Sequence, residues 1–294
     1  MVPPYGGRAP GRVPVIGTAR PVPGRRPLPS LGPAVGGSGM GIDLTGRAAL
    51  VTGGTRGIGF AIAERLLAAG AEVVVGGRTE PAALPSAGGR TAGFAAADIR
   101  DAAAAAGLVE AAAARLGRLD VLVNNAGGSP SADAAAVSPR FVERIVALNL
   151  LAPFYVAQPA NRIMQAQEGG GSIVNIGSVA AHDPQPGVAA YSAAKAGLLA
   201  LTRALALEWA PRVRVNHITT GLVLTEAAAG VYGEDGGAAV AGVVPLGRLA
   251  APGDVADACL FLASDLASYV TGADLAVHGG GEVPARYLVT RPPG

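Results

Sequence analysis

Short apolar stretches alternate along the chain with longer segments in which apolar positions recur every three or four residues. The short stretches are rich in valine and bounded by glycine, which is typical of buried strands, whereas the longer ones have the period of helices. The pattern predicts strands over Ala48–Thr52, Glu72–Gly76, Thr91–Ile99, Leu119–Asn124, Ser172–Ile176, Val213–Thr219 and Asp274–His278. It predicts helices that end at Ala69, cover Asp101–Leu116 and Pro139–Gln167, begin near Tyr191, and cover Pro252–Ala263.

This regular alternation indicates an α/β class of fold. Strands joined through helices pair in parallel, with right-handed crossovers between them. We therefore predict a Rossmann-like, doubly wound parallel sheet in a single domain over residues 43–283, followed by a C-terminal tail over 284–294. The glycine- and alanine-rich residues 221–247 are expected to form a mobile flap.

Residues 1–42 differ in composition from everything that follows them. They hold five arginines, no acid and many prolines and glycines, without helical or strand periodicity, so we expect a disordered leader. Prolines interrupt the continuous apolar segment that a secretory signal needs. We interpret the leader as a non-functional extension, with Met40 as the alternative start; a transit peptide is the other interpretation.

The charge of the folded part excludes one class of function. Beyond the leader there are 18 basic and 21 acidic residues, which is no footprint for nucleic acid. No uninterrupted apolar run reaches the roughly eighteen residues that span a bilayer, so no membrane partner is expected. The single cysteine, Cys259, lies in an apolar helical pattern and is interpreted as core packing in a reducing, cytoplasmic compartment. His182 and His217 lack metal-ligand spacing, and no metal is expected.

A glycine-rich turn, Thr52–Gly59, lies between the first predicted strand and the first predicted helix. Its glycines let the backbone approach a pyrophosphate, which then rests on the helix N-terminus. The second strand ends without the acid that binds the adenosine ribose of NAD, while Arg56 and Arg78 flank this region. Two guanidinium groups without a carboxylate suit a 2′-phosphate, which favours NADP(H) over NAD(H). The alternative is that both arginines are solvated surface residues.

Asp98 and Ile99 follow the third predicted strand and are candidates to flank the adenine. An N-cap role for Asp98 is the alternative. Asn124–Gly127 ends the fourth strand, at the carboxyl edge where open α/β sheets bind ligands.

Tyr191 and Lys195 are four residues apart, so their side chains share one face of a helix. Lys195 is the only lysine beside 22 arginines, which suggests a task that a guanidinium cannot perform. A surface tyrosine and lysine are the alternative interpretation. Ser178, thirteen residues before Tyr191 and directly after a strand, favours the catalytic one.

Asn149 stands inside an apolar helical run, where an amide is poorly suited to packing. Pro153, four residues later, has no N–H to donate to the Asn149 carbonyl, which leaves that carbonyl free to hold a water. The alternative is a kinked helix without a chemical role.

Taken together, these motifs resemble the short-chain dehydrogenase/reductase family, and 3-oxoacyl-carrier-protein reductases in particular, over residues 44 to about 283. The resemblance rests on TGxxxGIG at Thr52–Gly59, NNAG at Asn124–Gly127, and Ser178 placed thirteen residues before YxxxK. It implies a seven-stranded sheet in the order 3-2-1-4-5-6-7. It also implies an NADP(H)-dependent oxidoreductase of ketoreductase type that acts on a small carbonyl or alcohol.

The resemblance further implies a catalytic tetrad of Asn149, Ser178, Tyr191 and Lys195. Tyr191 would be the general acid or base, Ser178 would polarise the substrate oxygen, and Lys195 would lower the tyrosine pKa and hold the nicotinamide ribose. The implied cofactor contacts are Gly53, Thr55, Arg56, Gly57, Ile58, Gly59, Arg78, Asp98, Ile99, Asn125, Ala126, Gly127, Tyr191, Lys195, Gly221, Val223 and Thr225.

The chain departs from the family pattern at two further points. Thr220-Gly221 stands where relatives usually have Pro-Gly, which questions the rigidity of that loop, and His278 replaces an aspartate. The family also implies a homo-oligomer, a dimer or tetramer, paired through the helices at Pro139–Gln167 and Tyr191–Ala210. A catalytically silent dinucleotide-binding regulator is the alternative function; Ser178 and Tyr191 together argue against it.

Overall fold

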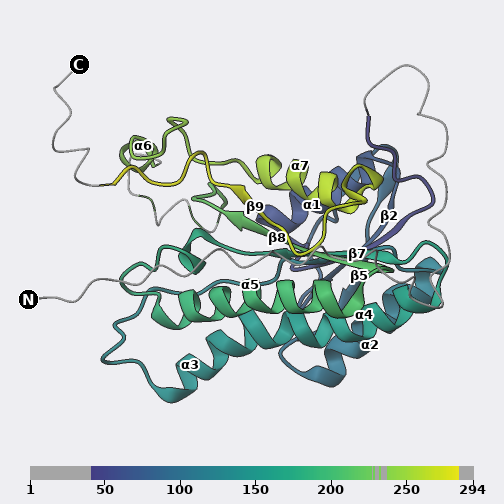
Figure 1. Ribbon diagram of the computed structural model, residues 1–294, viewed down its shortest axis with the longest axis horizontal. Coiled ribbons are helices and arrows are strands. Elements are labelled where there is room, and N and C mark those ends of the chain that lie inside the picture. Colours follow the sequence, from purple (N-terminus) through teal and green to yellow (C-terminus); the bar gives the residue numbers. More distant parts are fainter. Residues whose placement is uncertain (1–40, 227, 229–231, 233–236, 285–294) are drawn as a thin grey trace, which may run out of the picture. The chain divides into compact units, whose positions relative to one another are not determined.

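Seven strands pair in parallel and form the central sheet of the protein (Figure 1). A computed structural model describes residues 41–226, 228, 232 and 237–284. The sheet strands are β1 Ala48–Thr52, β2 Glu72–Gly77, β5 Gly93–Ala96, β6 Val121–Asn124, β7 Gly171–Ile176, β8 Val213–Thr220 and β9 Asp274–Val277. Their spatial order is β5-β2-β1-β6-β7-β8-β9, which confirms the predicted order 3-2-1-4-5-6-7. The predicted leader over 1–42 and the predicted tail over 284–294 lie almost wholly outside the described residues. Residues 227, 229–231 and 233–236 of the predicted flap over 221–247 lie outside them as well.

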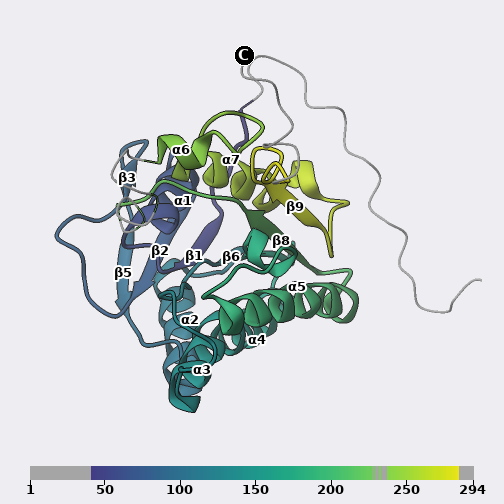
Figure 2. The ribbon, with the colours of Figure 1, turned by 90° about the vertical axis from the view of Figure 1, so that its left-hand side faces the viewer.

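Helices cover both faces of this sheet, as Figures 1 and 2 show. One face carries α1 and α7, which pack against each other, and the other carries α2, α4 and α5. The helices are α1 Gly57–Ala68, α2 Ala102–Leu116, α3 Pro139–Val146, α4 Ala152–Ala166, α5 Ala189–Trp209, α6 Ala238–Ala241 and α7 Pro252–Ala263. Because both sheet faces are buried, β1 and β6 are apolar and enclosed over almost their whole length.

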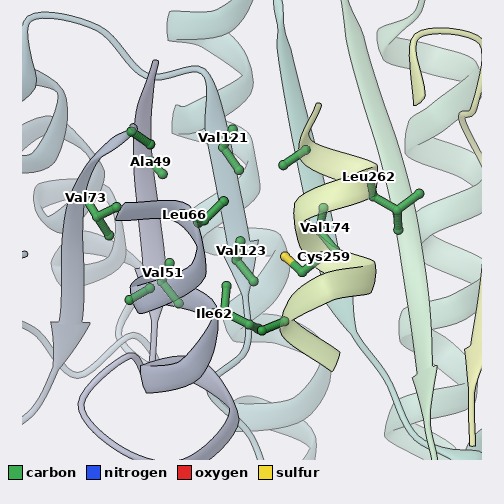
Figure 3. Packing of buried hydrophobic residues seen from close by; sticks show 14 of the residues in the cluster. Ala49, Val51, Ile62, Leu66, Val73, Val121, Val123, Val174, Cys259 and Leu262 are labelled. Carbon is green, nitrogen blue, oxygen red and sulfur yellow. The ribbon is translucent and has the colours of Figure 1, made fainter. Parts of the chain in front are cut away.

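Two hydrophobic cores result, one on each side of the sheet. Figure 3 shows the core beneath α1 and α7, where Ile62 and Leu66 meet Val51 and Val123 of the sheet. Cys259 of α7 lies fully buried in the same core, and burial raises the pKa of its thiol to about 12. Its predicted role in core packing is therefore confirmed, and its thiolate form is unfavourable.

Two elements differ from the predictions in extent. The predicted strand Thr91–Ile99 is shorter in the sheet, where β5 covers Gly93–Ala96, and a small antiparallel hairpin precedes it. The strands of this hairpin are β3 Ser86–Ala87 and β4 Arg90–Thr91, joined through Gly88 and Gly89, both with positive φ. Two consecutive glycines with positive φ form the tight turn that a two-residue hairpin loop requires.

The predicted helix Pro139–Gln167 is present as one helical run, but its middle is not an α-helix. Residues Ala147–Leu151 form a π-helical segment between α3 and α4, in which the Ala152 N–H donates to the Ala147 carbonyl five residues earlier. This run, Pro139–Ala166, is the one stretch of the described chain long and apolar enough to cross a membrane, judged by length and composition. A core helix passes the same test, and here α4 packs against α2 while α3 packs against α5.

Candidate active site

The glycine-rich turn is locked to the loop after β6. Asn125 donates from its side-chain amide to the carbonyls of Thr52 and Gly53, at 3.0 Å each. The Thr52 hydroxyl in turn accepts from the backbone N–H groups of Asn125 and Ala126. Gly53 has a φ of +63°, and a β-carbon there would lie 2.9 Å from the Ala126 Cα. The two loops therefore form one surface that approaches a ligand with backbone atoms.

Gly57 and Gly59 complete this surface at the start of α1. Gly57 has a φ of +56°, in the left-handed region that favours glycine. A β-carbon on Gly59 would lie 2.4 Å from the Gly53 carbonyl oxygen, so this residue allows the helix to pack on the turn. The N-terminus of α1 thus points its free N–H groups at the space beside the turn, which favours a phosphate.

An open cleft of about 560 Å³ lies over this turn and over the carboxyl ends of β1, β2, β5 and β6. Most of the predicted cofactor contacts line it together: Gly53, Thr55, Arg56, Gly57, Ile58, Arg78, Asp98, Ile99, Asn125, Ala126, Gly127 and Thr225. Five predicted contacts do not, and two of them, Tyr191 and Lys195, lie on α5 beyond the Gly127 end of the cleft. Gly59 supports the turn from behind, Gly221 lines a neighbouring hollow, and Val223 is buried and bridges to Ala250.

One residue of the cleft that sequence reasoning missed is Arg100. Its guanidinium holds Asp98 in a two-pronged ion pair, with Nε 2.9 Å from Oδ1. Hydrogen bonds from Arg100 lower the pKa of Asp98 to about 2, so this carboxylate is ionised but paired. Asp98 is not the N-cap of α2, because Asp101 accepts from the Ala104 N–H at 2.8 Å and fills that position. The N-cap alternative for Asp98 is therefore wrong.

Asn149 lies in the π-helical segment and is completely buried. Its side-chain oxygen accepts from the Gly128 N–H at 2.8 Å, and its side-chain nitrogen donates to the carbonyls of Gly128 and Ile145. The amide therefore ties the helix to the loop after β6. A β-carbon on Gly127 would lie 2.8 Å from the Asn149 Oδ1 and 3.3 Å from the Lys195 Nζ, which places all three residues at one end of the cleft.

Lys195 is buried on α5, with an exposed fraction of 4%. Its Nζ donates to the Ile176 carbonyl at 2.7 Å and lies 5.7 Å from the centre of the Tyr191 ring. Burial lowers the pKa of Lys195 to about 8, because an ammonium group loses its hydration in this position. The phenol and the amine thus share one space, as their spacing predicts.

Burial also raises the pKa of Tyr191, and the nearby Ser178 hydroxyl opposes that shift. The lysine is not among the main causes, so the expected lowering of this pKa by Lys195 is not seen in the protein alone. Ser178 directly follows β7 and Gly177, and its hydroxyl accepts from the Ala180 N–H at the start of a short 3₁₀ helix, Val179–Ala181. Ser178, Tyr191 and Lys195 thus come together at the carboxyl end of β7.

Thr220 holds the loop after β8 in place, although this chain lacks the Pro-Gly that relatives usually have there. Its hydroxyl donates to the Gly177 carbonyl at 2.8 Å, and the Gly221 N–H donates to Val277. The loop after β8 is therefore anchored on both sides. Among the described residues, no group of three or more His, Cys, Asp or Glu side chains could hold a metal ion.

Comparison with known proteins gives matches over nearly the whole described part of the chain. A family profile described as enoyl-(acyl carrier protein) reductase matches residues 53–282. D-threitol dehydrogenase of Mycolicibacterium smegmatis is 39% identical over 244 residues, which cover 81% of this chain and 93% of that protein. The 3-oxoacyl-[acyl-carrier-protein] reductase of Chlamydia pneumoniae is 35% identical, with coverages of 82% and 99%.

A solved structure is equally similar. It is described as an NAD(P)-dependent gluconate 5-dehydrogenase from Beutenbergia cavernae with NADP bound at low occupancy. Its sequence is 40% identical, its TM-score is 0.74, and the match covers 81% of this chain and 97% of that one.

Proposed function

Because this chain belongs to the short-chain dehydrogenase/reductase family of oxidoreductases, which bind a nicotinamide cofactor, we propose that it transfers hydride between NADP(H) and a carbonyl or secondary alcohol. The observation that carries this proposal is the meeting of Asn149, Ser178, Tyr191 and Lys195 next to Gly127, which lines one end of the cleft over the glycine-rich turn. The four side chains come from the π-helical segment, the end of β7 and helix α5. Such a convergence of a proton donor, a polarising hydroxyl and a buried cation suits carbonyl chemistry.

The cleft fits a dinucleotide by its shape at the glycine turn. β-Carbons at Gly53 and Gly59 would clash with the loop after β6 or with the turn itself, so the bare backbone is what faces a ligand. Gly57 and Ile58 at the start of α1 would hold the pyrophosphate, and Lys195 the nicotinamide ribose. The bound cofactor supplies or accepts the hydride.

The choice of NADP(H) rests on the adenosine end of the cleft. Arg56 and Arg78 line it, while β2 ends in Gly76-Gly77 without an acid. The Asp98 carboxylate, which would repel a 2′-phosphate, is paired with Arg100. The positive charge of the two remaining arginines therefore stays available for the phosphate.

Each member of the tetrad has a role in carbonyl reduction. Tyr191 donates the proton to the substrate oxygen, and the raised pKa of its phenol keeps it protonated for this direction. Ser178 donates a hydrogen bond to the same oxygen as negative charge develops there. Asn149 holds the loop at Gly128 and thereby the floor of the nicotinamide end.

One assay distinguishes an enzyme from the alternative, a catalytically silent dinucleotide-binding regulator. NADPH is mixed with the protein and a panel of activated ketones, 3-oxoacyl thioesters and sugar ketones, and its absorbance at 340 nm is followed. An enzyme oxidises NADPH with at least one member of the panel. A protein that binds NADPH but oxidises none of it across the panel would support the regulator instead.

We also propose that the protein forms a homo-oligomer through α4 and α5. Leu207 of α5 is exposed over 84% of its surface and Leu151 at the end of the π-helical segment over 38%, which is unfavourable in water. Sedimentation of the wild type and of Leu207→Glu tests this assembly. A wild-type chain that sediments as a monomer would contradict it.

A further inference from the structure

A carboxylate outside the tetrad, Asp274 at the start of β9, collects three hydrogen bonds. His182 Nε2 and His217 Nδ1 each lie 2.8 Å from one of its two oxygens, and the Thr219 hydroxyl donates to Oδ1 at 2.7 Å. The His217 side chain is fully buried and that of Asp274 is 15% exposed, whereas the His182 side chain is 43% exposed. The cluster therefore joins the edge strand, strand β8 and the loop that leads from β7 to α5.

The buried end of this cluster supports the residue that precedes Ser178. A β-carbon on Gly177 would lie 2.0 Å from Cε1 and Nε2 of His217, so the imidazole ring lies directly against the Gly177 backbone. The two peptide groups of Gly177 are also held, since its N–H donates to the Ile218 carbonyl and its carbonyl accepts from Thr220. The orientation of the His217 ring, fixed by Asp274, thus sets the surface on which Gly177 rests.

The exposed end of the cluster holds the residues that follow Ser178. One 3₁₀ turn connects Ser178 to His182, because Ala181 donates to the Ser178 carbonyl and His182 to the Val179 carbonyl. A hollow of about 820 Å³ opens beside this turn and is lined by Val179, His182 and Asp274. The turn therefore has open space on one side, and the bond from His182 to Asp274 ties it to the sheet.

We propose that Asp274 is a positioning residue for the catalytic centre, which fixes the Ser178 hydroxyl by holding Gly177 through His217 and the following turn through His182. This inference rests on the proposed function, in which Ser178 binds the substrate oxygen. Asp274 lines the hollow beside the turn and not the dinucleotide cleft, and in this account it acts through His217 and His182 and not by contact with the reacting atoms.

The charges around the cluster suit a static support. Burial lowers the pKa of His217, which the nearby Asp274 opposes and the nearby Lys195 and His182 reinforce, so the ring is neutral. A neutral ring that donates from Nδ1 to Asp274 has its Nε2 without a hydrogen, and this atom is buried without a partner. The contact with Gly177 is then one of packing, and the carboxylate is needed to hold the tautomer and the ring plane.

The test is a double-mutant cycle between Asp274 and Ser178, followed by NADPH oxidation at saturating cofactor. Asp274→Ala should lower kcat/KM for the carbonyl substrate about tenfold, without a change in the Kd for NADPH. Asp274→Asn, which keeps one acceptor oxygen, should fall between this variant and the wild type. Asp265→Ala is the matched control, because that carboxylate is 91% exposed and pairs only with Arg47 among the described side chains.

In the Ser178→Ala background, measured at high enzyme concentration, Asp274→Ala should cause less than a twofold further loss. A full tenfold loss in that background would overturn the inference, because Asp274 would then act on the structure as a whole and not through Ser178. An Asp274→Ala variant with wild-type kcat/KM beside an impaired Ser178→Ala would overturn it as well. A wild-type rate for Ser178→Ala would instead contradict the proposed function.

A second variant guards against loss of folding. If Asp274→Ala loses its cooperative melting transition, the same cycle is run with His182→Phe, which removes the contacts of this half-exposed ring with Asp274 and with the Thr219 hydroxyl. His182→Phe should give a smaller loss of kcat/KM that again disappears in the Ser178→Ala background. Equal losses in both backgrounds would overturn the inference in this version of the experiment.

Discussion

Burial governs the two titrating groups at the reacting end of the site. It lowers the pKa of Lys195 to about 8 and raises that of Tyr191, because both charged forms lose hydration between α5 and the sheet. Near neutral pH the pair is therefore an ammonium and a protonated phenol. This is the state from which a carbonyl oxygen can receive a proton.

The pH dependence of stability reports the buried lysine. In the unfolded chain Lys195 keeps its ordinary pKa of 10.5, so between about pH 8 and 10.5 the unfolded state binds more protons than the folded one. Folding stability of the wild type should therefore rise through this window relative to Lys195→Met, which has no such group. Thermal melts of both proteins from pH 7 to 10.5 measure the difference.

Leu199→Met, on the same helix and equally without a charge, is the control and should show a constant offset from the wild type. A difference between wild type and Lys195→Met that does not change with pH would mean that the amine is hydrated in the folded protein.

In the proposed function, the arginines that line the cleft beyond β2, Arg56 and Arg78, determine the preference for NADP(H). Replacing Arg56 and Arg78 together with alanine should raise the KM for NADPH by about a hundredfold and that for NADH by less than threefold, because only NADPH has a 2′-phosphate. Arg65→Ala is a matched control: it removes an arginine of α1 that pairs with Asp257 and does not line the cleft. Equal KM values for the two cofactors in the wild type would contradict the NADP(H) assignment.

At the residue scale, local spacing made the proximity of Ser178, Tyr191 and Lys195 predictable, whereas contacts between residues far apart in the sequence could not be predicted. Tyr191 and Lys195 are one helical turn apart, and Ser178 follows a strand, so the sequence alone places them near one another. Asp98 and Arg100 are also close in the sequence, so their ion pair could have been predicted from two opposite charges just after a strand. His182 and Asp274 are 92 residues apart, and only the pairing of β7 with β8 and of β8 with β9 brings the loop after β7 close to Asp274.

The helical run from α3 to α4 changes its hydrogen-bond register at the site. The π-helical segment bonds each N–H five residues back, and Pro153 has no N–H. Its missing donor would face Leu148 in the π register or Asn149 in the α register. We propose that one of these carbonyls is left free for a water that serves Lys195.

Pro153→Ala restores this donor. The variant should be at least as stable as the wild type, since it can gain a helical hydrogen bond, and its turnover should fall about tenfold, or about 1.4 kcal/mol in the barrier. Melting temperature and kcat over the pH range measure both effects. Pro159→Ala, inside the same helix and also buried, is the control and should leave turnover unchanged. Unchanged turnover in Pro153→Ala would reduce the π-helical segment to a packing feature.

Long helices and strands could be predicted from the sequence, whereas the short ones could not. The apolar strands and the alanine-rich α2 have enough residues to display their periods. The hairpin of β3 and β4 has strands of two residues, too short for any alternation, although its Gly88-Gly89 turn is a recognised hairpin signal. The π-helical segment is too short to show a distinct pattern of apolar positions, and only Asn149 and Pro153 indicated an irregularity there.

At the scale of the whole molecule, the alternation of strands and helices predicted a parallel sheet but not the order of its strands. Right-handed crossovers allow many orders, and the order 3-2-1-4-5-6-7 came from the resemblance to a family. The order in which strands are added to the sheet reverses between the parallel strands β1 and β6. The loops that follow these two strands therefore lead to opposite faces of the sheet, and the cleft opens between them. The site follows from this topology once the order is known.

The proposed tetrad and cofactor contacts lie between Gly53 and Thr225, and the positioning residue Asp274 lies further still from the N-terminus. We therefore expect that deletion of residues 1–39 leaves the melting temperature within about 2 °C and kcat within about twofold of the full chain. Both quantities are measured on the two proteins side by side. A clear loss of either would show that the leader contributes to the folded enzyme.

The central claim is that Tyr191 donates the proton at the reacting oxygen, and Tyr191→Phe tests it most directly. The change removes one hydroxyl group and keeps the ring, so the Kd for NADPH should stay within about twofold while kcat for carbonyl reduction falls by about a thousandfold or more. Tyr155→Phe, on α4, where the ring packs against the hydrophobic core on that side of the sheet, should leave kcat unchanged. A Tyr191→Phe enzyme that retains more than about a tenth of the wild-type kcat would contradict the account.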